Sequence, residues 1–264
     1  MKKFLSLLYV IIVLAFVYVP ILILVFYSFS SGKTTGNFEV FSLKWYGKLG
    51  EIKDVVLNTV VLAVVSSAIA TILGTLGAIG IFYSKGKFGK TVNGISQIPV
   101  VNSEVVTACA LVMLFMALGF AHRSIFGVYV GHVILTTPFV VLSVMPKLKQ
   151  MDGSLYEAAL DLGASPTQAL FKVILPEILP GILSGFMLAI TLSLDDYIIT
   201  ATLSPLSFDT ISTAVYKSIA LTTEKASEKI PIYRALTTII FLLTVLVVIL
   251  NATVKKRNKK GEVK

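Results

Sequence analysis

The chain has 264 residues, of which 56% are hydrophobic and only 14% are charged, and its mean hydropathy is +0.88. This balance excludes an ordinary soluble domain and is typical of a protein that lies mainly in lipid. The formal net charge is +9, but the basic residues flank apolar segments, so we expect no nucleic-acid partner. The single cysteine, Cys109, excludes an intrachain disulfide and a cysteine zinc cluster.

Charge-free apolar runs close to the length that crosses a bilayer, about 20 residues, recur along the chain. They are Phe4–Phe29, Val55–Ser84, Val105–Ala121, Ser124–Pro146, Ile178–Leu194 and Ala235–Val254. We predict an all-α polytopic membrane protein with about six transmembrane helices, the third beginning near Ile98 and the fifth extending to about Leu203. One permease-like membrane domain is expected to cover residues 1–264. A signal peptide is disfavoured, because the first run is too long and no small-x-small cleavage site ends it.

Basic residues concentrate on alternate loops, which predicts the orientation in the membrane. They are Lys2, Lys3, Lys85, Lys87, Lys90, Lys147, Lys149 and Lys172, followed in the C-terminal tail by Lys255, Lys256, Arg257, Lys259 and Lys260. With six spans these loops all fall on one side, and the positive-inside rule makes that side the cytoplasm. We therefore predict a multi-pass protein of a bacterial cell membrane with both termini cytoplasmic.

The loop between the fourth and fifth runs, about residues 150–176, begins with the signals of a capped helix. Ser154 and Glu157 have the spacing of a capping box, so a helix is expected to begin at Leu155. Gly163 suits the left-handed position just past the end of that helix.

A second cap follows in the same loop. Ser165 precedes Pro166, which suits the first helical position, and Gln168 completes another capping-box pattern. Two short helices joined at a glycine turn would form a rigid cytoplasmic protrusion on which another protein can dock. An ordinary interfacial loop is the alternative. Pro176 and Pro180 then predict an articulated entry into the fifth helix.

Three acids lie at membrane depth: Glu104, Asp195 and Asp196. A carboxylate there costs about 2.5–3.5 kcal/mol, so it is expected to face a cavity or a partner. Carboxylates along a path suit cations, and Tyr197 would add a cation–π face. On a continuous helix Asp195 and Asp196 point about 100° apart, so one can face a path while the other meets a neighbouring helix. The alternative is that these acids tie helices together or pair with a partner subunit.

The sequence contains no catalytic constellation. Gly89–Thr91 resembles the end of a phosphate-binding loop, but Ser84 stands where that motif needs glycine, and no β-strand can precede it. His122 and His132 lack ligand-like neighbours and are expected to be structural. We therefore predict a non-catalytic chain that binds no cofactor or metal itself.

Glu157-Ala158-Ala159, Gly163 and Ile174-Leu175-Pro176 resemble the EAA signature of the membrane subunits of ABC importers. In that family the loop carries the coupling helix, which sits in a cleft on a cytoplasmic ATPase. The resemblance implies a similar second permease subunit, an ATPase dimer that binds ATP and Mg, and an extracellular or periplasmic substrate-binding protein. The positions that it assigns to ATPase coupling are Glu157, Ala158, Ala159, Gly163, Leu175 and Pro176.

Thr191–Tyr197 and Asn102–Val106 resemble segments of the spermidine/putrescine permeases, and the similarity covers nearly the whole chain. It implies polyamine transport with substrate contact at the membrane acids, Asp195 first. Ser103 stands where relatives often have proline, which gives weaker grounds for a helix break at Glu104. The alternatives are an importer for another cationic or small solute (thiamine, ferric iron or an aminophosphonate) and an ion-coupled secondary transporter.

Overall fold

A computed structural model of the chain describes residues 2–33, 38–84, 91, 94, 98–121, 123–220 and 229–261. The all-α prediction is confirmed: the elements of the described residues are helices, and the strand-like pairing among them is the isolated bridge Ser30–Phe41. The chain divides into two compact units, unit 1 (Met1–Asp54 with Val215–Lys264) and unit 2 (Val55–Ala214). The single-domain organisation stays a prediction.

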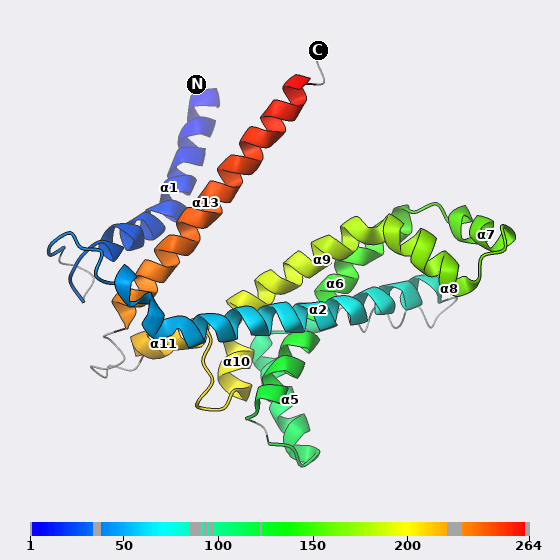
Figure 1. Cartoon of the computed structure of the whole chain (residues 1–264), viewed down its shortest axis with the longest axis horizontal. Helices are drawn as coiled ribbons and strands as arrows, with labels where there is room; N and C mark the ends of the chain where they lie inside the picture. The colour runs from blue at the N-terminus through cyan, green and yellow to red at the C-terminus, as the bar shows by residue number, and fades with distance from the viewer. Residues whose placement is uncertain are drawn as a thin grey trace. The chain divides into compact units, whose positions relative to one another are not determined.

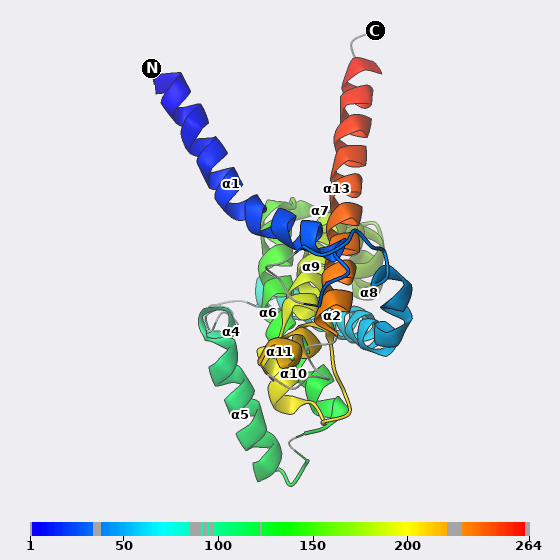
Figure 2. The same ribbon diagram turned by 90° about the vertical axis from the view of Figure 1, so that its left-hand side faces the viewer.

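Unit 1 contains the first and last long helices of the chain. These are α1 (Lys2–Ser28) and α13 (Ile230–Gly261), and they pack against each other. The 3-10 helix η1 (Tyr46–Ile52) packs on α13, and the second half of α11 (Ile211–Ala220) belongs to the same unit. The N-terminal end of α1 and the C-terminal end of α13 lie at the same end of this unit in both views (Figures 1 and 2).

Unit 2 is built around two long helices that pack side by side, α6 and α9 (Figure 1). Its elements in chain order are α2 (Lys53–Tyr83, in this unit from Val55), α4 (Ile98–Val101), α5 (Glu104–Ala117), α6 (Ile125–Gln150), α7 (Ser154–Asp161), α8 (Pro166–Ala169), the π-helix η2 (Leu170–Ile174), α9 (Leu175–Asp195), α10 (Ile198–Leu203) and the start of α11. Figure 1 shows α7 at one end of α9 and α10 at the other.

The centre of unit 2 depends on close helix contacts at glycines. A Cβ added at Gly74 of α2 would lie 2.7 Å from the Cβ of Val140, and one added at Gly185 of α9 would lie 3.2 Å from Cγ1 of the same valine. Lipid gives helices no hydrophobic drive to associate, so small residues that allow close approach stabilise such a bundle by packing. Val140 of α6 is therefore held between two glycine-bearing helices.

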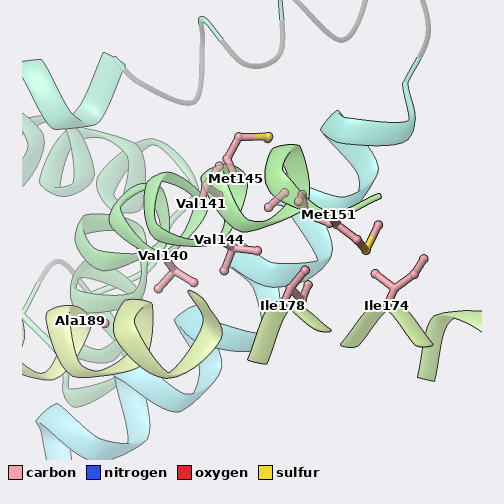
Figure 3. Close-up of a cluster of buried hydrophobic side chains, with 10 residues drawn as sticks. Val140, Val141, Val144, Met145, Met151, Ile174, Ile178 and Ala189 are labelled. Carbon is pink, nitrogen blue, oxygen red and sulfur yellow. The ribbon is translucent and has the colours of Figure 1, made fainter. Parts of the chain in front are cut away.

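A buried apolar cluster continues from this contact toward the loop after α6 (Figure 3). Val144 and Leu148 of α6 pack with Ile174 of η2 and Ile178 of α9, and each is at most 1% exposed. Met151, just past α6, joins the same cluster. The base of the loop is thus packed on the membrane helices.

Within the part of the chain that the structure describes, four helical runs are long and apolar enough to cross a membrane: Leu5–Ser28, Tyr46–Tyr83, Ile125–Gln150 and Pro166–Asp195. The apolar helices Glu104–Ala117 and Ile230–Leu246 are shorter and correspond to the third and sixth predicted spans. The prediction of several membrane helices is therefore confirmed, whereas the number six stays a prediction.

The third predicted helix does not run unbroken from Ile98. Ser103 lies between α4 and α5 in an extended conformation (φ −71°, ψ 146°), and its hydroxyl accepts a hydrogen bond from the backbone N–H of Val106 at 3.4 Å. A serine at this position satisfies a free N–H of the new helix. The helix break at Glu104, for which Ser103 gave weaker grounds than a proline, is therefore present, and a serine cap forms it.

Pro138 does not end the fourth helix, because α6 continues to Gln150. The hydroxyls of Thr136 and Thr137 bond the carbonyls of His132 and Val133 at 2.8 and 2.6 Å.

Candidate translocation and coupling sites

Asp152 caps α7, the first helix of the protrusion. Oδ1 of Asp152 accepts two hydrogen bonds from Ser154, one from its backbone N–H at 3.0 Å and one from its hydroxyl at 2.9 Å. These two bonds hold the pKa of Asp152 below its ordinary value. The predicted capping box of Ser154 and Glu157 is therefore wrong: the Ser154 hydroxyl donates to the carboxylate, and the helix begins at Ser154 instead of Leu155.

The end of α7 has the predicted left-handed glycine. Gly163 has φ +84°, its N–H donates to the carbonyl of Leu160 at 2.9 Å, and the N–H of Ala164 donates to Ala159 at 3.0 Å. This pair of bonds is the Schellman arrangement, which satisfies carbonyls that the helix end would leave free. The prediction for Gly163 is confirmed in conformation.

The second cap also forms as predicted. The Ser165 hydroxyl accepts from the N–H of Gln168 at 3.3 Å, the Gln168 side chain accepts from the N–H of Ser165 at 3.0 Å, and Pro166 begins the helix. The expectation of a second short helix was wrong, however. α8 continues through η2 into α9, so that one helical run extends from Pro166 to Asp195.

The π-helical turn explains how α8 joins α9 despite a proline. Pro176 has no N–H and its ring crowds the carbonyl four residues back, which would interrupt a regular α-helix. Just before it, the N–H of Leu175 bonds the carbonyl of Leu170, five residues back. The wider turn admits the extra residue, so the expected joint at Pro176 and Pro180 is a continuous helix with one widened turn.

The six positions assigned to ATPase coupling fall in two places. Glu157, Ala158 and Gly163 are exposed on α7 and its end, and Ala159 beside them is half-buried. Leu175 and Pro176 lie at the start of α9, next to the buried cluster. Coupling at these residues stays a prediction, with an exposed part on α7 and a part at the base of the protrusion.

At the other end of α9, Asp196 ends the helix. It is 4% exposed and extended (φ −61°, ψ 129°). Its Oδ1 accepts from the N–H of Ile199 at 3.1 Å, and its Oδ2 accepts from the N–H and the hydroxyl of Thr200, both at 2.9 Å. The prediction of one helix extending to Leu203 was therefore wrong, because this carboxylate starts α10 as a new helix.

His132 of α6 packs against this break and is fully buried. Its Nε2 lies 2.9 Å from the Thr200 hydroxyl and 3.4 Å from Oδ2 of Asp196, and its Nδ1 lies 2.7 Å from the Ser193 hydroxyl. The Thr200 hydroxyl donates its one hydrogen to Asp196, so it accepts from Nε2. The Ser193 hydroxyl also meets that of Ser66 on α2 at 3.3 Å.

This network of His132, Ser193, Asp196 and Thr200 joins α6, α9 and α10 and reaches α2 through Ser66. His132 is structural, as the sequence predicted, whereas His122 lies outside the described residues. The contacts of Asp196 favour the alternative that the sequence left open for it, a carboxylate that ties helices together.

The other two acids are exposed. Asp195 lines a shallow cavity of about 340 Å³ together with Thr191, Leu192 and Leu194. Glu104 begins α5 and lies near enough to both aspartates for their charges to repel. Tyr197 is half-buried at the start of α10. The structure therefore brings the predicted acids together but gives them different surroundings: Asp196 is bonded inside, and Asp195 and Glu104 face outward.

The described residues thus form a helical membrane domain with a doubly capped protrusion at one end of α9 and acids at the other. The chain belongs to the family described as the binding-protein-dependent transport system inner membrane component, which matches residues 70–260. It is thus a non-catalytic membrane permease subunit of an ABC importer, and ATP hydrolysis is the task of another subunit. Membership of this family excludes the alternative that the chain is an ion-coupled secondary transporter.

Among its relatives, the spermidine/putrescine transport system permease protein PotC of Escherichia coli (strain K12) is 30% identical over 250 residues, 94% of this chain and 92% of that protein. PotC of Haemophilus influenzae is also 30% identical, with coverage of 94% and 95%. The putrescine transport system permease protein PotI of Escherichia coli (strain K12) is 35% identical over 219 residues, 78% of this chain and 76% of that protein.

Solved structures support the fold. A bacterial ABC transporter that imports the acidic polysaccharide alginate matches with a TM-score of 0.71 and 20% identity, covering 97% of this chain and 95% of that one. The inward-facing MetNI methionine ABC transporter matches with a TM-score of 0.59 and 18% identity, covering 80% and 95%. At these identities the likeness concerns the arrangement of helices alone.

Proposed function

We propose that this permease carries polyamines and that Asp195, with Glu104 beside it, offers the substrate its counter-charge. The observation that carries the proposal is the contrast between the acids: Asp196 is bonded to backbone and side-chain donors, whereas Asp195 and Glu104 are exposed. The charges of both aspartates act on Glu104, that of Asp196 more strongly than that of Asp195. Two neighbouring carboxylates repel, and a ligand with two ammonium groups relieves that repulsion. The relatives named for spermidine and putrescine support the same substrate class.

The proposed assembly follows the family. A second, similar permease subunit completes the path, a cytoplasmic ATPase dimer binds ATP and Mg, and an extracellular or periplasmic binding protein delivers the substrate. The exposed face of α7 docks on the ATPase, with Glu157 and Ala158 on its surface. The matched structure of an alginate importer in complex with its substrate-bound periplasmic protein supports a delivery partner of that kind.

In the proposed orientation the protrusion and both termini are cytoplasmic. The first residues of α1 and the last residues of α13 lie at the same end of unit 1 (Figure 2), which supports placing both on one side of the membrane. Within unit 2, α9 separates the protrusion from Asp195 by 21 residues, about 30 Å along a helix. A cytoplasmic protrusion therefore leaves Asp195 in the outer half of the bilayer.

In the proposed mechanism, this chain transmits the movement of the ATPase to the acids at the far end of α9. The buried contacts of Ile174 and Ile178 hold the base of the protrusion to α6, and the helical run from Pro166 continues without interruption to Asp195. When the ATPase moves α7, the displacement passes along this run to the acids. The bonded Asp196 keeps the end of α9 fixed in shape, so that Asp195 turns with the helix.

The test is ATP-dependent uptake of labelled putrescine and spermidine by the complete importer in proteoliposomes. Asp195→Asn removes one charged contact, and we expect KM for the polyamine to rise about tenfold or more while the yield of assembled complex is unchanged. Glu51→Gln, which removes an exposed acid of η1 that pairs with Lys48, is the matched control and should transport normally.

Two outcomes would overturn separate parts of the proposal. If the importer neither accumulates polyamines nor hydrolyses ATP faster in their presence, the substrate class is wrong. If Asp195→Asn reduces assembly as much as uptake, Asp195 has a helix-tying role instead of a substrate-binding one.

A further inference from the structure

Arg234, near the start of α13 in unit 1, is a buried cation with unused donors. Its side chain is 6% exposed. One terminal nitrogen, Nη2, donates to the carbonyls of Gly32 and Lys33, both at 3.1 Å. Its Nε and its other terminal nitrogen, Nη1, have no hydrogen-bond partner among the described residues. A buried guanidinium costs free energy unless an anion or further acceptors pair with it.

Arg234 is one of the residues that line a cavity of about 470 Å³ between α1, α11 and α13. The cavity walls are mainly apolar and include Leu24 of α1, Ile219 of α11 and Ile230 of α13. Ser218, Tyr233 and Thr237 add hydroxyl groups to the lining. Its size falls in the range of small-molecule sites. The lining is therefore complementary to a ligand with one anionic group and a large apolar part.

The position of the cavity along the helices fits the membrane boundary. Arg234 lies four residues after the start of α13, about 6 Å along its axis, and bonds the loop that follows α1. On α1 the lining extends back to Pro20, eight residues and about 12 Å from the end of the helix at Ser28. The charged end of the cavity is thus near the loops, and its apolar end extends toward the bilayer core.

We propose that this cavity binds an anionic phospholipid: the Arg234 side chain turns toward the cavity so that its Nε and Nη1, which are covered in the structure, donate to the headgroup phosphate, and an acyl chain lies along Leu24 and Ile219. A guanidinium presents its donors in a planar fork that matches phosphate oxygens. A free phosphate would satisfy the same donors but would leave the apolar walls in contact with water. The inference does not depend on which solute the permease carries.

The site can be measured on the full-length chain in nanodiscs that contain equal parts of phosphatidylglycerol and phosphatidylcholine. Native mass spectrometry counts the lipids that remain bound after release. We expect a preference for phosphatidylglycerol of about fivefold, the contribution of one basic residue at an anionic lipid surface. Arg234→Gln should reduce that preference to about equal retention, and Arg234→Lys should keep part of it.

Two further variants separate the site from general effects. Leu24→Phe fills the apolar end and keeps the arginine, so it should also lower retention of phosphatidylglycerol. Lys229→Gln removes a positive charge five residues away without altering the lining and should retain the preference.

The proposal fails if the wild-type chain retains both lipids equally, or if Arg234→Gln keeps the preference while Lys229→Gln loses it. Displacement of the lipid by inorganic phosphate would overturn it as well, since the site would then recognise an anion alone. If phosphatidylglycerol binds only when the second permease is absent, the site is an interface for that subunit, and the lipid is not its occupant.

Discussion

Replacing His132 by leucine tests whether the polar network at the end of α9 holds the membrane helices together. Leucine fills similar space but removes the contacts of both ring nitrogens with Ser193, Thr200 and Asp196. Each lost neutral hydrogen bond costs about 0.5–1.5 kcal/mol. The buried carboxylate of Asp196 also loses a ring nitrogen that lies 3.4 Å from its Oδ2.

The upper bound is the cost of breaking a buried charge pair, about 3–5 kcal/mol. Asp196 keeps three donors, namely the N–H of Ile199 and both the N–H and the hydroxyl of Thr200, so the full cost does not apply. We expect His132→Leu to lower the free energy of unfolding by about 2–4 kcal/mol. Thr136→Val, one turn along α6, removes a buried hydroxyl that bonds its own helix, and it should cost at most about 1.5 kcal/mol.

The assay is equilibrium unfolding of the purified chain in detergent, combined with a double-mutant cycle with Asp196→Asn. Because the two side chains share one network, we expect a coupling energy of about 1–3 kcal/mol. A loss for His132→Leu no greater than that for Thr136→Val, together with additive single and double variants, would refute the reasoning. The network would then be a set of independent local bonds.

The remaining predictions concern the protrusion. Glu157→Lys reverses a charge on the exposed face of α7 without removing a described hydrogen bond or ion pair, so the purified complex should assemble normally but lose polyamine-stimulated ATP hydrolysis; normal stimulation would exclude docking through this face. Gly163→Ala places a Cβ on a residue with φ +84°, which costs about 1–2 kcal/mol, so we expect uptake to fall. The control Gly153→Ala changes a residue with negative φ and open space around its Cα, so it should be tolerated. Equal uptake by the two alanine variants would show that the left-handed turn is not needed for coupling.

Local signals in the sequence predicted the parts of the protrusion that depend on neighbouring residues. Gly163 and the Ser165–Gln168 pair were found because a turn or cap requires particular residue types at fixed spacing. The Ser154–Glu157 pattern failed because Asp152, two residues earlier, offers a charged acceptor that binds Ser154 more strongly than a neutral one. Competing caps cannot be ranked by spacing alone.

The acid site was only partly predictable for a different reason. Hydropathy identified Glu104, Asp195 and Asp196 as unusual at membrane depth, but the partners of Asp196 include His132, which is 64 residues away in the chain. One signal was available: Asp196 stands three residues before Ile199, the separation between a helix N-cap and the N–H that its side chain accepts from. Arg234 was missed because a single arginine near a helix end usually indicates an interfacial charge.

The widened turn between Leu170 and Ile174 sets the angular phase of everything that follows it. In a regular α-helix, one inserted residue rotates all later side chains by about 100° relative to those before it, whereas a π-helical turn takes up that residue within a single wider turn. Deleting one residue from this turn would therefore restore regular winding and leave the direction of Asp195 nearly unchanged, whereas winding the same residues as a regular α-helix would rotate Asp195 by about 100° relative to α8. The wider winding of that turn thus decides which way Asp195 faces when the protrusion is held in place.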